Sequence, residues 1–331
     1  MSNRDGAKMG AEPKAETLRT KIGFGAVYGV CWLVGLLPLW FLYYVLADTI
    51  YFLLYRVARY RVKVVRANLS SSFPEKSAKE LRLIERRYYH TLSEYFVDAI
   101  DMASITPRQL LRRVHWPAEN RAELNRLTAG RNWITLLAHY GSWEIMNAYG
   151  LYADGPVMSS VYHPLNNKVF DLYYYKIRNR LAKLHSVAMK EVLRFYMANR
   201  DGVDGFPLSI GLVADQNAPL DAQSRWVPFL NHPTVFFHGG EKIARKFGLP
   251  VYFMHVRRLG RGRWEQTFEL IWDGVSPTED FAITGEYVRL LEEDIRRAPE
   301  LWLWSHRRWK KRIHGTAARD YNAAYGTDYP E

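Results

Sequence analysis

The chain has 331 residues, a net charge of +12 and a hydrophobic content of 48%. This length allows one large domain or two small ones, and this hydrophobic content excludes a chain that is disordered throughout. The single cysteine, Cys31, excludes an internal disulfide framework and a cysteine-based metal site, while the positive charge favours an anionic partner such as nucleic acid, anionic lipid or an acidic small molecule.

The N-terminal part of the chain is polar and then strongly apolar. Residues 1–21 are mixed in charge, and we expect a loose tail there. Ile22 to Ala47 contains no charged residue, and the apolar character continues to residue 55. A run of this length predicts a hydrophobic membrane-anchor helix over residues 22–55. Because Pro38 would kink such a helix, a re-entrant or interfacial helix is an alternative, and a buried hairpin of core helices is another.

Basic residues without an acidic residue follow this run. They are Arg56, Arg59, Arg61, Lys63 and Arg66. The positive-inside rule predicts that this flank, and with it the large C-terminal part of the chain, lies in the cytoplasm.

Residues 56–130 have the amphipathic pattern of helices. Ser77 and Glu80 have the spacing of a capping box, and Thr106-Pro107 predicts another helix start. A row of large apolar side chains at helical spacing is typical of core packing; it contains Tyr88, Tyr89, Leu92, Tyr95 and Phe96.

From residue 131 onward, strand and helix patterns alternate. The predicted strands cover 133–138, 157–162, 209–214, 251–256 and 265–272, and the predicted helices cover a segment from 143, then 166–181, 189–199, 237–247 and 284–297. This alternation predicts an α/β fold with a mostly parallel central sheet flanked by helices. We expect this domain to cover residues 56–314, with a C-terminal tail over 315–331.

The stretch WITLLAHYGSWEIMNAYG, residues 133–150, contains the strongest candidate site. It predicts a buried strand, a turn at Gly141-Ser142 and then a helix with Ser142 as its N-cap. His139 follows the strand and Glu144 lies in the first helical turn. If the turn brings them together, a neutral imidazole can deprotonate a hydroxyl while a carboxylate on its other nitrogen fixes the tautomer. The alternative is a surface histidine and a solvated glutamate at a helix start.

Other charged positions are candidates for substrate binding. Asp215 follows an apolar strand, at the edge where open α/β sheets place their sites, although it could also cap a turn. Arg178 and Arg180 lie on a predicted tyrosine-rich helix, where they could bind phosphate or carboxylate or form a solvated face.

The run LWLWSHRRWKKR, Leu301 to Arg312, interleaves three tryptophans with six basic residues, counting His306. This mixture suits a membrane interface with anionic head groups, or nucleic acid. An amphipathic packing helix with a basic outer face is the alternative. The chain contains no G-x-S-x-G, Walker or H-E-x-x-H motif, so it implies neither a metal nor a cofactor.

Several segments match one family in order along the chain. They are RANLSSSFPE at 66–75, HYGSWE at 139–144, VYHPLNN at 161–167, Arg-x-Arg at 178–180, ADQ at 214–216, VPFLNHPT at 227–234 and PELWLWSHRRWK at 299–310. HYGSWE resembles the His-x-x-x-x-Asp/Glu motif of the lysophospholipid acyltransferase superfamily. The ordered set resembles the bacterial lipid A late acyltransferases of the lauroyl/myristoyl type.

The chain departs from this family in places. His163 replaces the arginine of the usual Tyr-Arg-Pro segment, and Phe229-Leu230-Asn231 replaces the usual Phe-Phe-Gly. These changes suggest a divergent branch, which could act on a different acceptor. We keep His163 among the expected substrate-binding residues.

The resemblance implies an O-acyltransferase that moves a fatty acyl chain from acyl carrier protein to a hydroxyl of a lipid A precursor. It implies a site at the cytoplasmic face of the bacterial inner membrane, with no nucleic acid as partner. His139 would be the general base and Glu144 its orienting group. Arg178, Arg180, Asp215 and His163 would bind substrate, and the helix after Gly141 or Arg180 would stabilise the oxyanion.

Because no activated serine or cysteine is visible, direct attack without a covalent acyl-enzyme is the simplest mechanism. Two alternatives stay open. One is an acyltransferase that acts on a lysophospholipid, an amino-acid lipid or a glycolipid. The other is a non-catalytic, membrane-anchored binding protein.

Overall fold

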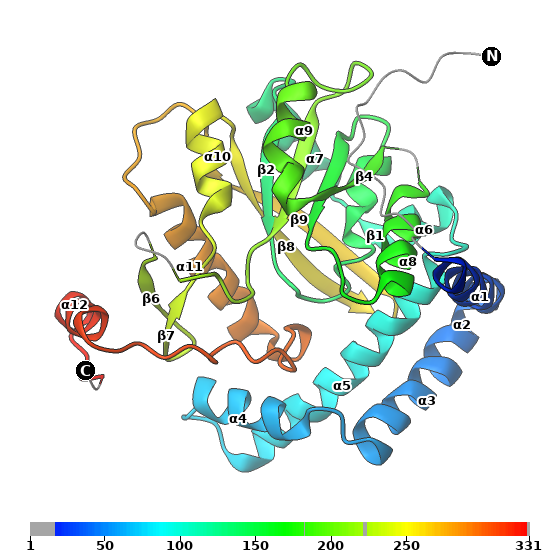
Figure 1. Ribbon diagram of the computed structural model, residues 1–331, viewed down its shortest axis with the longest axis horizontal. Coiled ribbons are helices and arrows are strands. Elements are labelled where there is room, and N and C mark those ends of the chain that lie inside the picture. The colour runs from blue at the N-terminus through cyan, green and yellow to red at the C-terminus, as the bar shows by residue number, and fades with distance from the viewer. Residues whose placement is uncertain (1–16, 182, 221–223, 330–331) are drawn as a thin grey trace.

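A seven-stranded sheet forms the centre of the protein (Figure 1). The computed structural model describes residues 17–181, 183–220 and 224–329. The strand order is β1-β9-β8-β2-β5-β3-β4, and β8, β2, β5, β3 and β4 all run parallel, whereas β9 and β1 run in the opposite direction. The predicted α/β fold with a mostly parallel sheet is therefore confirmed.

The strands lie close to their predicted positions where the apolar runs are long. They are β1 (Val114–His115), β2 (Trp133–Leu137), β3 (Val157–Tyr162), β4 (Leu184–Ala188), β5 (Leu208–Val213), β8 (Val251–Gly260) and β9 (Arg263–Trp272), with β6 (Trp226–Phe229) and β7 (His232–Val235) in a separate hairpin. The sequence did not predict β1, β4, β6 or β7. β1, β6 and β7 have two to four residues, which are too few to show a pattern. β4 is as long as β2, but His185 and Ser186 interrupt its apolar run.

The helices include several short 3₁₀ and π segments, which are labelled η. They are α1 (Leu18–Gly35), α2 (Leu39–Phe41), η1 (Leu42–Leu46), α3 (Ala47–Tyr51), η2 (Phe52–Val57), α4 (Val62–Ser72), α5 (Ala78–Asp101), α6 (Pro107–Arg113), α7 (Ala118–Thr128), η3 (Met146–Leu151), α8 (Lys168–Asn179), η4 (Met189–Glu191), α9 (Val192–Ala198), α10 (Gly239–Phe247), α11 (Ala282–Arg297), η5 (Pro299–Leu301) and α12 (Thr316–Tyr325). The capping boxes at Ser77 and Thr106 form as hydrogen-bonded pairs at the starts of α5 and α6.

The central strand β2 is buried along its whole length because both faces of the sheet are covered. On one face, α10 packs so closely that a Cβ added at Gly240 would lie 2.9 Å from Leu212 and 3.1 Å from Leu136. On the other face, the Tyr149 hydroxyl of η3 lies 2.9 Å from the Ser209 hydroxyl of β5.

The apolar N-terminal run forms two helical arms instead of one straight helix. The arms, Leu18–Gly35 and Leu39–Val57, meet at 111° across the break that contains Pro38. Within the described chain, no helix alone has the length and apolar character to cross a bilayer, whereas this bent pair meets both criteria together. The expected single anchor helix is therefore not confirmed, and the expected kink at Pro38 is.

The two ends of the chain differ in what the structure describes of them. Residues 1–16, most of the expected N-terminal tail, lie outside the described residues. At the other end, the expected tail contains α12, whose Ala318 and Tyr321 are buried together with Ile313.

Candidate active site

His139 and Asp215 meet at the carboxyl ends of two neighbouring parallel strands. β2 and β5 pair up to Leu137 and Val213, and each of the two site residues follows two residues later. The His139 Nδ1 atom lies 2.8 Å from Asp215 Oδ1, and the His139 backbone N–H donates to Asp215 Oδ2 at 3.1 Å. The sheet order therefore builds the pair at the edge where α/β proteins place their sites.

Asp215 is almost completely buried and accepts several hydrogen bonds. The Trp302 indole N–H donates to Oδ2 at 2.8 Å, in addition to the two bonds from His139. Burial alone would raise the pKa of Asp215, but the neighbouring His139 and these donors hold that pKa below its usual value. The ionised carboxylate fixes the proton on His139 Nδ1, so that Nε2 presents a lone pair.

The free side of the His139 ring faces a cavity. Its Nε2 atom lies 3.1 Å from the Gln216 amide nitrogen, which donates to it in this tautomer. The Trp143 ring meets the imidazole edge-on, with centroids 5.0 Å apart, and the His139 side chain remains 18% exposed. A hydroxyl that replaced the Gln216 amide would be within reach of a general base.

Glu144 does not contact His139; it pairs with Arg178 of α8. The Arg178 Nε donates to Glu144 Oε2 at 2.8 Å and Nη2 donates to Oε1. The segment after Ser142 forms turns and then 3₁₀ helix η3, instead of the expected α-helix. This path takes the Glu144 carboxylate to α8, and the Ser142 hydroxyl donates to Asp98 instead of capping a helix. The expected orienting contact is therefore wrong, and Asp215 takes its place.

A cavity of about 750 Å³ connects these groups. Its polar lining includes His139, Glu144, Arg178, Gln216 and His163, and its apolar lining includes Leu137, Met158, Val161, Gly211, Val213 and Phe237. This volume and mixed lining are typical of a site for a small molecule or an acyl chain.

The chain matches the family of bacterial lipid A biosynthesis acyltransferases over residues 9–311. The chain belongs to this family. It is 25% identical to a lipid A biosynthesis lauroyltransferase of Escherichia coli (strain K12), over 88% of this chain and 92% of that protein. It is 33% identical to lipid A biosynthesis acyltransferase 2 of Shigella flexneri, over 40% of each chain.

The other expected substrate-binding residues of this acyltransferase lie in different places. Arg178 lines the cavity, and His163 is exposed at the same lining. Asp215 is buried and outside that lining, where it accepts from His139 and Trp302, so it does not lie where the expected substrate-binding role would place it. Arg180 is outside that lining, and its guanidinium donates to the backbone carbonyls of Met102, at 3.2 Å, and Ile105. Arg180 thus holds the chain after α5, and a role at the oxyanion does not fit this geometry.

The departure at Phe229-Leu230-Asn231 has a local structural explanation. Leu230 and Asn231 form the turn between β6 and β7, with φ of 49° and 64°. Asparagine tolerates this left-handed conformation, which glycine usually supplies. The replacement therefore preserves a hairpin and gives no information about the acceptor.

The tryptophan-rich run after Leu301 is part of the interior. Trp302 and Trp304 are 2% and 0% exposed, so the expected membrane or nucleic-acid face is wrong for these two residues. The Leu303 N–H donates to the His139 carbonyl at 3.1 Å, which ties the run to the active-site loop.

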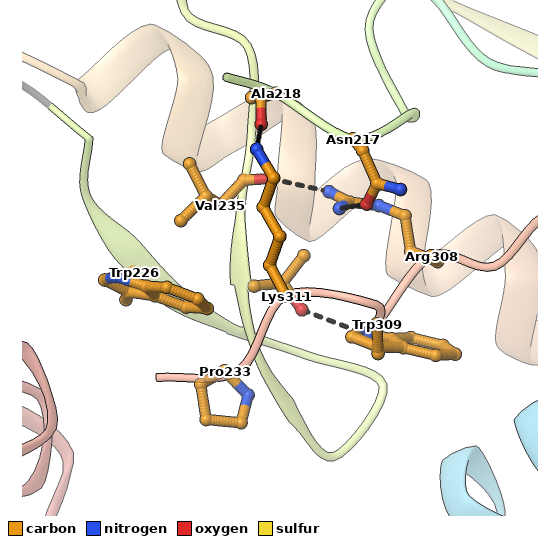
Figure 2. A pocket seen from close by; sticks show the side chains of 9 residues that line it. Asn217, Ala218, Trp226, Pro233, Val235, Arg308, Trp309 and Lys311 are labelled. Carbon is orange, nitrogen blue, oxygen red and sulfur yellow. Dashed lines mark hydrogen bonds between the residues drawn. The ribbon is translucent and has the colours of Figure 1, made fainter. Parts of the chain in front are cut away.

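Two basic residues of this run, Arg308 and Lys311, contact the backbone of neighbouring segments, whereas Arg307, Lys310 and Arg312 are exposed. Figure 2 shows Arg308 reaching Val235 and Asn217, while Lys311 reaches Ala218. Burial lowers the pKa of Arg308 to about 10, an effect that Asp215 opposes. Burial also lowers the pKa of His306 to about 4, so His306 is neutral at pH 7 and was wrongly counted as basic.

Sequence reasoning missed two residues of the site, Trp302 and Gln216. Both lie in segments that carried the resemblance, PELWLWSHRRWK and ADQ. The signal was present, but no local pattern connects either residue with His139.

Proposed function

We propose that this protein transfers a fatty acyl chain from the thioester of acyl carrier protein to a hydroxyl of a lipid A precursor. The observation that carries the proposal is the His139–Asp215 hydrogen bond at the lining of a 750 Å³ cavity with an apolar wall. Membership of the lipid A acyltransferase family supports the substrate class.

In the proposed mechanism, His139 acts as general base. Its Nε2 takes the proton of the acceptor hydroxyl while the oxygen attacks the thioester carbonyl. The tetrahedral intermediate then collapses, the carbon–sulfur bond breaks, and the leaving thiolate takes the proton back from His139. Asp215 stabilises the imidazolium between these steps. The Gln216 amide, close to Nε2, is a donor suited to the oxyanion.

Glu144 acts in this scheme through Arg178. The buried carboxylate holds the guanidinium at the cavity by two hydrogen bonds. The pair is neutral as a whole, but it fixes a guanidinium whose other N–H groups can donate to the anionic groups of either substrate. Glu144 is thus a positioning residue for Arg178.

The proposed setting is the cytoplasmic face of the bacterial inner membrane. The bent N-terminal helices expose large apolar side chains, including Leu18, Ile22, Leu33 and Trp40. The basic flank after residue 55 favours the cytoplasmic side. A net charge of +12 suits an acidic carrier protein and a phosphorylated acceptor.

The choice of acceptor has one alternative. His163 lines the cavity where the family usually has an arginine, so the acceptor could be another hydroxyl-bearing lipid with fewer anionic groups. Lipid profiling of a deletion strain distinguishes the two acceptors.

The test is an acyl-transfer assay with purified protein, lauroyl-acyl carrier protein and a tetra-acylated lipid A precursor. We expect acylated product from the wild type and none from His139→Ala. Retained turnover by His139→Ala would refute the mechanism, and no product from the wild type would refute this acceptor.

A further inference from the structure

A second hollow lies apart from the active-site cavity, at the junction of η2 and α4. It measures about 270 Å³ and is lined by Tyr55, Arg56, Arg59, Val62 and Arg66. None of these residues lines the 750 Å³ cavity. The hollow therefore needs an explanation that does not involve the reacting groups.

The charges at this hollow are unbalanced. Arg66 pairs with the buried Glu85, by Nε–Oε2 and Nη2–Oε1 contacts of 2.8 and 3.0 Å, and the Tyr55 hydroxyl also donates to Glu85 at 2.9 Å. Within the described parts of the chain, Arg56 and Arg59 have no carboxylate partner. The three arginines contribute three positive charges, and Glu85, which contacts Arg66, contributes one negative charge, so the local charge is +2.

The turn that contains Arg59 has an unusual backbone conformation. Arg59 and Arg61 have φ of 48° and 52°, in the left-handed region that arginine rarely adopts. Arg61 is held in place by a bond from Nη1 to the Ser305 carbonyl at 2.9 Å. The turn that presents Arg59 is therefore fixed by the rest of the fold.

The apolar surface of the N-terminal helices leads directly to the hollow. Phe52, Leu53 and Val57 are 56%, 50% and 62% exposed, and Arg56 and Arg59 lie directly before and two residues after Val57. In Figure 1, α3 lies beside α5 and the chain then turns into α4 at the edge of the molecule. An apolar face that ends in arginines matches the boundary between the hydrocarbon and the head groups of a membrane.

The same turn is connected to the active-site loop. Asn68 of α4 donates to the Trp304 and His306 carbonyls at 2.8 and 2.9 Å. The run that contains Trp304 and His306 also contains Leu303, whose N–H donates to the His139 carbonyl. A group bound in the hollow would thus lie at a fixed position relative to the catalytic base.

We propose that Arg56, Arg59 and Arg66 form a binding site for the phosphate of a lipid head group. The forked guanidinium groups match phosphate oxygens, and the bound phosphate would set the height of the active-site cavity above the membrane. This inference rests on the membrane setting proposed above, but not on the acyl-transfer chemistry.

The test measures the binding of short-chain phosphatidic acid to the full-length protein in neutral detergent, by calorimetry. We expect Arg56→Gln/Arg59→Gln to weaken binding about thirty-fold, because each basic residue near a membrane surface contributes about one kcal/mol. The matched control, Arg126→Gln/Lys246→Gln, removes two exposed charges from α7 and α10, which both lie away from α4 in Figure 1, and should bind as the wild type does.

A second variant separates a built site from diffuse attraction. Arg56→Lys/Arg59→Lys keeps the charge but loses the fork, so we expect it to weaken binding too; wild-type affinity would overturn the proposal. Equal affinity for inorganic phosphate would also overturn it, because the lipid would then contribute nothing.

An acidic protein is the competing occupant. If Arg56→Gln/Arg59→Gln weakens the binding of acyl carrier protein but leaves phosphatidic acid binding unchanged, the hollow is a protein-docking site and the proposal fails. Because both measurements are made without turnover, their outcome is independent of the acyl-transfer assay.

Discussion

At the scale of single residues, the proposed chemistry depends on which carboxylate holds Nδ1 of His139. Asp215 does so at 2.8 Å, while Glu144 is committed to Arg178. Two carboxylates near one cavity thus have different tasks, and their substitutions should affect different kinetic constants.

We predict that Asp215→Asn lowers kcat by about 10³- to 10⁴-fold, because the amide cannot stabilise the imidazolium and favours the wrong tautomer.

Glu144→Gln should mainly raise KM, because Arg178 loses its ionic partner. Steady-state kinetics of the two variants, with far-UV circular dichroism as the folding control, test this. A large fall in kcat with unchanged KM for Glu144→Gln would return the orienting role to Glu144.

His306 gives a pH prediction. Burial holds its folded pKa near 4, below about 6.5 in the unfolded chain, so the stability that it contributes is present above pH 6.5 and is lost as pH falls towards 4. The loss reaches at most about 3 kcal/mol, and solvent screening of the partly exposed ring reduces it. Denaturant unfolding at pH 7 and pH 5 should show a smaller pH dependence for His306→Gln than for the wild type. Equal dependence would contradict this prediction.

At the scale of elements, a buried polar network connects the N-terminal helices with the active-site loop. Arg113 of α6 pairs with Asp98 and Asp101 of α5, and Asp98 also accepts from Tyr43 of η1 and Ser142 of the loop. The consecutive helices α5 and α6 thus meet the distant segments η1 and the Ser142 loop around one guanidinium group.

We predict that Arg113→Gln destabilises the protein by about 3–5 kcal/mol, because it leaves two buried carboxylates without their cation. Its exposed neighbour provides the control, since Arg112→Gln should change the free energy of unfolding by less than about 0.5 kcal/mol. Denaturant unfolding of both variants in detergent measures the difference. Similar values for the two variants would show that the network contributes little.

At the scale of the whole molecule, the cavity runs along the sheet from His139 towards Gly211 and Met158. On the same face of the sheet, Ser209 lies two residues before Gly211 on β5. The Ser209 hydroxyl lies 2.9 Å from the hydroxyls of both Thr135 and Tyr149, so these side chains fill the sheet face there. In the proposed function, the depth available to an acyl chain would therefore be limited by side chains from three strands and η3.

We predict that Gly211→Ala shifts the preference towards shorter acyl donors. The added Cβ would lie 2.8 Å from the Met158 Cε, which must move and fill part of the cavity. The ratio of kcat/KM for lauroyl over decanoyl donor should fall about ten-fold. Gly285→Ala on α11, where an added Cβ meets no atom within 4 Å, is the control. An unchanged ratio in Gly211→Ala would place the end of the chain elsewhere.

Much of the fold could be predicted because it follows from local patterns. Long apolar runs, the Ser77 capping box and the break at Pro38 all act within a few residues, and each appears in the structure. The strand β4, whose apolar run is interrupted by His185 and Ser186, and the turns after Ser142 were missed, because their conformation depends on the neighbours that cover them.

The sequence by itself determined the α/β alternation, the family, and the positions of His139 and Asp215 after apolar strands. Only the tertiary structure decided that these two residues, 76 positions apart, are partners, because strand order cannot be read from local periodicity. The tertiary structure also decided that Glu144 pairs with Arg178, that Arg180 donates to backbone carbonyls after α5, and that Trp302 and Trp304 are buried. Each of these contacts joins distant segments, and packing across the sheet selects them.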